Sequence, residues 1–146
     1  MSITYQIDHG KRRILAIATG ALGVRDLVAF QQEIGSDSTF SGYDAIFDAS
    51  WVDSLLDLNI DNLKRLAVLA ASSDVAGMPS KLVIVAPQEV YFGLGRMYGS
   101  FRESVPGSCR ASDTFRSRKE AERWLDVRNE NELAAFSGMT APVSLR

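Results

Sequence analysis

The stretch KLVIVAPQEVYFGLGRMYGSF, residues 81–101, limits the possible folds of this chain more than any other segment. An apolar run, LVIVA, ends at Pro87 and has the length and composition of a strand buried on both faces. An aromatic pattern of helical period, interrupted by glycines, begins at Gln88. A buried strand that leads directly into a helix is the repeating unit of α/β folds, so the sequence predicts an α/β domain.

The remaining segments extend this alternation of strands and helices. Asp-His-Gly between two β-prone runs predicts an N-terminal hairpin, and Asn59 and the Ser117–Glu120 capping box predict helix starts. We interpret Ser50–Leu58 as a loop around a partly buried Trp51. The predicted strands are residues 3–8, 13–19, 43–48, 81–86 and 108–112, and the predicted helices are residues 24–34, 59–75, 88–103 and a last one from Ser117.

The order of these elements, ββαβαβαβα, predicts the fold class. The hairpin pairs the first two strands antiparallel, and right-handed helical crossovers make the later pairs parallel. We therefore expect a single α/β domain over residues 1–127, with a mixed, mostly parallel five-stranded sheet flanked by about four helices. Residues 128–146 are polar, then small and irregular, and we predict a loosely held C-terminal tail.

Composition excludes several classes of protein. The 146 residues are 46% hydrophobic and 23% charged, values typical of a globular protein rather than a disordered chain. No apolar run is long enough to span a membrane, and the N-terminus does not resemble a secretory signal, so we expect a cytoplasmic protein. A net charge of −2 argues against nucleic acid as a partner, and the single cysteine, Cys109, excludes an internal disulfide.

Three segments resemble those of a known family. FGLGRMY after the VIVAP strand, FDAS at the end of the preceding strand, and FRSRKEAERWL near the C-terminus are similar to the SpoIIAA-like proteins, relatives of the STAS domain. The resemblance covers about residues 3–127 and implies a STAS-like fold. It further implies an interaction or regulatory module, since STAS relatives bind protein partners and sometimes nucleotides.

Some of those relatives are switched by phosphorylation of a serine at a helix start. In this chain the corresponding helix opens at Asn59, without a hydroxyl side chain at its cap, and the DSSG pattern is absent. Ser50 and Ser54 lie upstream in the predicted loop. We therefore do not predict a phosphorylation switch.

The predicted helix over residues 88–103 has two faces, and its outer face is the leading candidate for an interface. Two glycines four residues apart leave a notch, which either another segment of this chain fills or a protein partner or second copy covers. We assign Val90, Leu94, Met97 and Phe101 to the core face and Phe92, Gly95, Arg96, Gly99 and Arg102 to the partner-binding face.

A second hypothesis places a small ligand at the carboxyl ends of the strands, where open α/β sheets bind ligands. The sequence brings Thr19, Asp48, Ser50 and Pro87 to that edge, and the ligand would be a lipid or a nucleotide. A third hypothesis is an enzyme that depends on a metal ion or on acid chemistry at Asp48.

The sequence shows no catalytic constellation. His9, the single histidine, lies in a predicted turn, and Gly93, Gly95 and Gly99 lie too far into the helix for a dinucleotide-binding loop. We therefore predict no catalytic residue, metal site or cofactor, and favour a non-enzymatic module.

Overall fold

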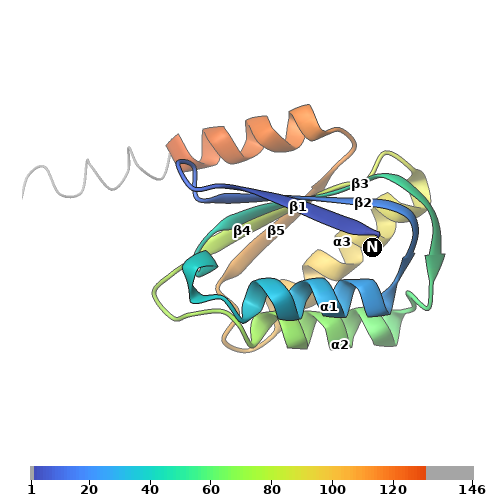
Figure 1. Cartoon of the computed structure of the whole chain (residues 1–146), viewed down its shortest axis with the longest axis horizontal. Helices are drawn as coiled ribbons and strands as arrows, with labels where there is room; N and C mark the ends of the chain where they lie inside the picture. The colour runs from blue at the N-terminus through green and yellow to red at the C-terminus, as the bar shows by residue number, and fades with distance from the viewer. Residues whose placement is uncertain (1, 131–146) are drawn as a thin grey trace, which may run out of the picture.

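The computed structural model describes residues 2–130 and contains a twisted five-stranded sheet (Figure 1). The strands lie in the order in which they occur in the sequence, β1-β2-β3-β4-β5. The first pair is antiparallel and the other three pairs are parallel, as predicted. The strands are β1 (Ile3–Asp8), β2 (Arg13–Gly23), β3 (Asp44–Leu56), β4 (Ser80–Val85) and β5 (Arg110–Phe115).

Helices cover both faces of the sheet (Figure 1). Three of them lie on one face: α1 (Val24–Gly35), α2 (Ile60–Ala71) and α3 (Glu89–Ser104). A helix over residues 118–130, orange in Figure 1, lies against the opposite face. A short 3₁₀ turn, η1 (Ser38–Phe40), precedes β3. This arrangement confirms the predicted α/β class with a mixed, mostly parallel sheet.

Two of the predicted helix starts are confirmed at the level of hydrogen bonds. The Asn59 side chain accepts a hydrogen bond from the Asn62 N–H at 2.9 Å, which satisfies one of the free donors at the start of α2. Ser117 Oγ accepts from the Glu120 N–H at 3.2 Å, and the two side chains also interact, at 3.1 Å. Short polar side chains in these two sequences therefore fix where the helices begin.

The two faces of the sheet have separate apolar cores. On the face of the 118–130 helix, Ile46, Val83 and Val85 pack with Ala121 and Leu125. On the other face, the sheet packs against α1, α2 and α3. Its buried apolar residues there include Ile3, Ile14, Ala16, Ala18, Leu22, Tyr43, Ala45, Ala49 and Val52.

The 118–130 helix is also bound to the sheet by polar contacts near its C-terminal end. Arg13 forms an ion pair with Asp126 at 2.9 Å, and Asn129 bonds to both Asp44 and Lys81 at 3.2 and 3.1 Å. The prediction of a loose tail from residue 128 is thus wrong for residues 128–130, which are helical. The rest of the predicted tail, residues 131–146, lies outside the described residues.

The predicted loop over residues 50–58 is wrong, because β3 continues to Leu56. Thr19–Gly23 of β2 pairs with this segment as a two-stranded extension of the sheet. Two register shifts, where β3 carries an extra residue, break the alternation of apolar and polar side chains that marks a strand. Trp51 is 57% exposed rather than partly buried.

The outer edge of β5 is covered by side chains of the chain itself. The carbonyls of Cys109 and Phe115 accept hydrogen bonds from the Ser80 and Ala86 N–H groups, at the two ends of β4. Because backbone groups of successive residues in a strand point to opposite sides, the N–H groups of Ser112 and Thr114 point away from β4. Glu103 accepts a hydrogen bond from the Ser112 N–H at 2.6 Å, and Asp113 accepts one from the Thr114 N–H at 2.8 Å. Two carboxylates therefore occupy donors that a further strand would need.

Candidate functional site

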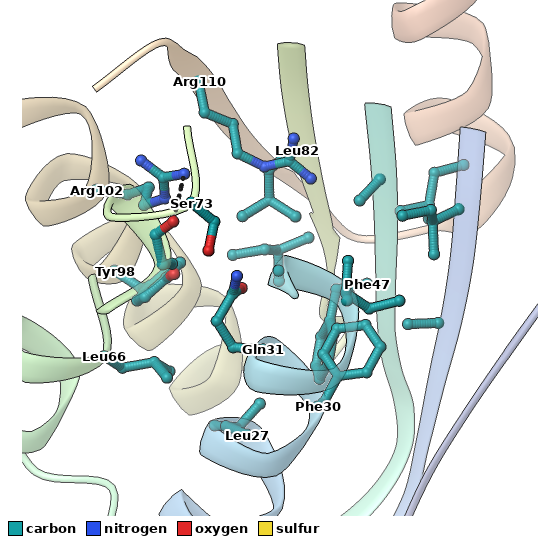
Figure 2. Close-up of a pocket in the computed structure, with 18 of the residues that line it drawn as sticks. Leu27, Phe30, Gln31, Phe47, Leu66, Ser73, Leu82, Tyr98, Arg102 and Arg110 are labelled. Carbon is teal, nitrogen blue, oxygen red and sulfur yellow. Dashed lines mark hydrogen bonds between the residues drawn. The ribbon is translucent and has the colours of Figure 1, made fainter. Parts of the chain in front are cut away.

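The main candidate site is a cavity of about 200 Å³ between the sheet and the layer formed by α1, α2 and α3 (Figure 2). It lies beneath the helices because small residues on the sheet, Ala16, Ala45 and Ala49, leave space that the helices do not fill. Most of its wall is apolar. The larger apolar side chains include Leu27, Phe30, Phe47, Leu66, Leu82 and Leu94.

One end of the cavity is polar and centres on a buried ion pair. Arg102, which is 2% exposed, donates to both carboxylate oxygens of Asp74, at 3.0 and 2.6 Å. Asp74 also accepts from the Cys109 N–H at 2.8 Å, and Arg102 donates to Ser108 Oγ at 2.9 Å. Burial opposes ionisation of Asp74, but the hydrogen bonds from Arg102 and Cys109 and the charges of Arg102 and Arg110 hold its pKa below the ordinary value.

Arg110 lines the same end of the cavity. Its Nη1 donates to the Tyr43 carbonyl at 3.0 Å and to Ser80 Oγ at 2.5 Å. Within residues 2–130, no carboxylate forms an ion pair with it. Burial, reinforced by the charge of Arg102, lowers the pKa of the Arg110 guanidinium. The polar end of the cavity therefore contains a cation without a directly bound anion.

Three neutral polar side chains complete this end. Figure 2 shows Gln31, Ser73 and Tyr98 around the apolar space close to Arg102. Burial raises the pKa of the Tyr98 phenol, which keeps it protonated and able to donate a hydrogen bond. The site thus combines an apolar body with a polar end that is rich in donors.

The lining of the cavity extends to the surface of the molecule. It includes Val75 and Met78, which are 42% and 37% exposed, in the connection between α2 and β4. Gly42, in the segment that leads into β3, lies against Met78. These residues mark the side on which the cavity opens to the surface.

The assignment of the two faces of α3 is wrong, because the glycine face points inward. Gly95, Gly99 and Arg102 are its buried residues, whereas Val90, assigned to the core, is 68% exposed. A Cβ at Gly95 would lie 3.1 Å from side-chain atoms of Ile84 and Thr114, so β4 and β5 pack directly on the helix backbone. The notch is therefore filled by the chain itself, which was one of the two alternatives.

Two of the predicted partner-binding residues remain near the surface. Phe92 is half-buried, with the guanidinium of Arg116 4.2 Å and that of Arg96 5.9 Å from its ring centre. Arg102, by contrast, belongs to the polar end of the cavity and cannot contact a partner across a surface.

The four residues predicted to bind a ligand at the sheet edge lie in or just after the neighbouring strands β2, β3 and β4, and Asp48 and Ser50 are hydrogen-bonded to each other. Asp48 is 1% exposed and lies on the face of the 118–130 helix, where it accepts from Arg118 Nε and the Ser50 N–H, both at 2.9 Å. Thr19 pairs with Trp51, and the Pro87 carbonyl accepts from Arg116 at 3.5 Å. None of the four lines the cavity.

The residues that form the polar end were not predicted as a site. Arg102 and Asp74 lie 28 residues apart, and no local spacing connects them. For Arg110 the sequence contains a weak signal of a polar site. Arg110, Ser112 and Thr114 alternate along a strand, so three polar side chains share its inward face. In the described part of the chain, no cluster of three or more metal-ligating His, Cys, Asp or Glu side chains forms, and no helix could cross a membrane.

Comparison with known proteins identifies the fold. No protein-family model matches the chain, and no curated protein matches its sequence. A solved structure from Shewanella loihica PV-4, described as an uncharacterised protein of the DUF3478 family with a SpoIIAA-like fold, is similar over 85% of this chain and 93% of its own. The TM-score is 0.55 and the sequence identity 16%. The chain therefore has the SpoIIAA-like fold that its sequence predicted.

Proposed function

We propose that this protein binds a small, mainly apolar molecule in the cavity between α1–α3 and the sheet. This is the predicted small-ligand function, placed in a different part of the molecule from the predicted sheet edge. The observation that supports it is the size of the cavity, about 200 Å³ with a mostly apolar wall. A dry cavity of about 150 Å³ in another protein binds benzene, so there is room for a molecule slightly larger than that.

The apolar wall supports the same proposal. Apolar surface that faces water costs about 25 cal/mol per Å² relative to surface that is buried. A ligand with an apolar body would cover this wall and recover that free energy on binding.

Toluene, an uncharged probe of matching size, tests the proposal by titration calorimetry. We expect it to bind the unmodified protein and to fail to bind Leu66→Trp, because Leu66 is buried on the cavity wall. Val68→Trp is the matched control, since Val68 lies on the same helix and is 58% exposed. Absence of toluene binding to the unmodified protein, or equal loss in both variants, would contradict the proposal.

We propose protein binding as a second candidate function, through a surface around Trp51 in β3. Trp51 is 57% exposed, and the guanidinium of Arg118 lies 5.8 Å from its ring centre. Exposed aromatic side chains beside arginines are enriched at protein interfaces. The partner would be another protein or a second copy of this chain.

Light scattering of the unmodified protein and of Trp51→Ser tests the version with a second copy. If a dimer forms through this surface, the substitution reduces the mass to that of one chain, while Val68→Ser leaves it doubled. A mass that is unchanged by Trp51→Ser argues against this surface as the dimer contact.

A further inference from the structure

We infer that the cavity selects an amphipathic monoanion, a carboxylate on an apolar body of about six to ten non-hydrogen atoms, and that Arg110 binds the carboxylate. The inference rests on the proposed small-molecule function and specifies the class of ligand.

Four ionised side chains of the described residues line the cavity. Asp37 is exposed to solvent and accepts a hydrogen bond from the Thr39 N–H, whereas Arg102, Arg110 and Asp74 form the polar end. The latter three leave an excess of one positive charge. Asp74 does not pair directly with Arg110: it accepts two hydrogen bonds from Arg102 and one from the Cys109 N–H. A ligand with a single negative charge would balance the site.

Arg110 is half-buried, so its charge is only partly hydrated. A guanidinium that has lost part of its hydration is stabilised by a paired anion. Arg110 forms no ion pair within residues 2–130, and its lowered pKa reflects the same loss of hydration. The nearby carboxylate of Asp44 bonds instead to the Lys81 N–H and to Asn129, on the opposite face of the sheet.

Arg110 retains donors for a ligand. Among the described residues it donates only through Nη1, which leaves the Nε and Nη2 hydrogens available. These donors have the fork geometry that binds both oxygens of a carboxylate. Arg110 and Leu82 both line the cavity, so a carboxylate bound to Arg110 would have its chain beside the apolar wall. The protonated Tyr98 phenol supplies a neutral donor at the same end.

Calorimetry with three ligands of equal chain length tests the inference: octanoate, 1-octanol and octylammonium. A hydrogen bond to a charged group contributes about 1.5–3 kcal/mol, so octanoate should bind about 10- to 100-fold more tightly than 1-octanol. Octylammonium should bind more weakly than both. Octyl phosphate, which is mostly a dianion at pH 8, should bind more weakly than octanoate.

Variants then assign the effect to Arg110. Arg110→Met should reduce octanoate affinity to that of 1-octanol and leave 1-octanol affinity unchanged, and Arg110→Lys should give an intermediate value. Arg116→Met is the matched control, because Arg116 is 47% exposed and outside the cavity lining. Circular dichroism and thermal unfolding establish that each variant is folded.

The two proposals fail in different ways. If toluene, 1-octanol and octanoate all fail to bind the unmodified protein, the small-molecule function is wrong. If toluene or 1-octanol binds but octanoate binds no more tightly than 1-octanol, only the inference of a carboxylate ligand is overturned. Tighter binding of octyl phosphate than of octanoate would likewise overturn the choice of a monoanion.

Discussion

Arg102 is the largest fully buried side chain of the described residues, and its burial depends on Asp74. A buried charge is stable only when an opposite charge and further hydrogen bonds replace the lost water. Asp74 supplies the charge, and Ser108 and the Ala70 carbonyl accept further hydrogen bonds. From the sequence, Arg102 is predicted to lie on the outer face of the helix. Nothing near an arginine in a helical pattern indicates a buried partner 28 residues away.

Asp74→Asn should lower the free energy of unfolding by about 3–5 kcal/mol, because it leaves the Arg102 charge buried without its anion. Urea unfolding at pH 7 measures the change. Asp53→Asn is the control, since Asp53 is exposed and should change stability by less than about 0.5 kcal/mol. Equal effects of the two substitutions would refute the role of the ion pair.

The contribution of Asp74 should also depend on pH. Its pKa is lower in the folded protein than in the unfolded chain, so its stabilisation is present above the unfolded pKa, about 3.9. The stabilisation is lost as the pH falls through the lower, folded value. The stability difference between the unmodified protein and Asp74→Asn should therefore shrink below about pH 4.

At the scale of elements, α3 shows what periodicity can and cannot predict. The predicted bounds, residues 88–103, agree with Glu89–Ser104 to within one residue. The predicted orientation is wrong because the glycines, which lack side chains, occupy the face in closest contact with the sheet. A pattern of apolar side chains identifies a core face only where side chains, rather than backbone, form the contact.

Two glycine substitutions in α3 should have opposite effects. Gly93→Ala should stabilise the protein by about 0.5–1 kcal/mol, because a Cβ there meets no atom within 4 Å and alanine favours the helix. Gly95→Ala should destabilise it by about 1 kcal/mol, since contacts with Ile84 and Thr114 outweigh the same gain. Thermal unfolding of the two variants checks the signs, and stabilisation by both would contradict the close packing of α3 on β4 and β5.

At the scale of the whole molecule, the sheet is covered on both faces, and among residues 2–130 a single helix, residues 118–130, covers one of them. Element order and capping residues predicted this architecture well, because each signal lies within a few residues of sequence. The cavity could not be predicted, since it depends on how three helices meet over small side chains such as Ala16 and Ala45. Such a volume is determined by packing between segments distant in sequence.

Leu125→Ala should destabilise the whole molecule by about 2–5 kcal/mol, because Leu125 is fully buried between the 118–130 helix and the sheet. Val127→Ala, at a site 48% exposed on the same helix, should change stability by less than about 1 kcal/mol. Chemical denaturation followed by tryptophan fluorescence, with Trp124 in that core, measures both. Similar small effects would mean that the helix contributes little to the stability of the sheet.

The carboxylates of Glu103 and Asp113 along the outer edge of β5 have a consequence for how the protein behaves at high concentration. An uncovered edge strand acts as a template on which other chains can add strands and form aggregates. Because these two side chains already accept the Ser112 and Thr114 N–H bonds, the edge offers few free donors to an incoming strand. The protein thus resists fibrous self-assembly at this edge without shortening β5 or placing a proline in it.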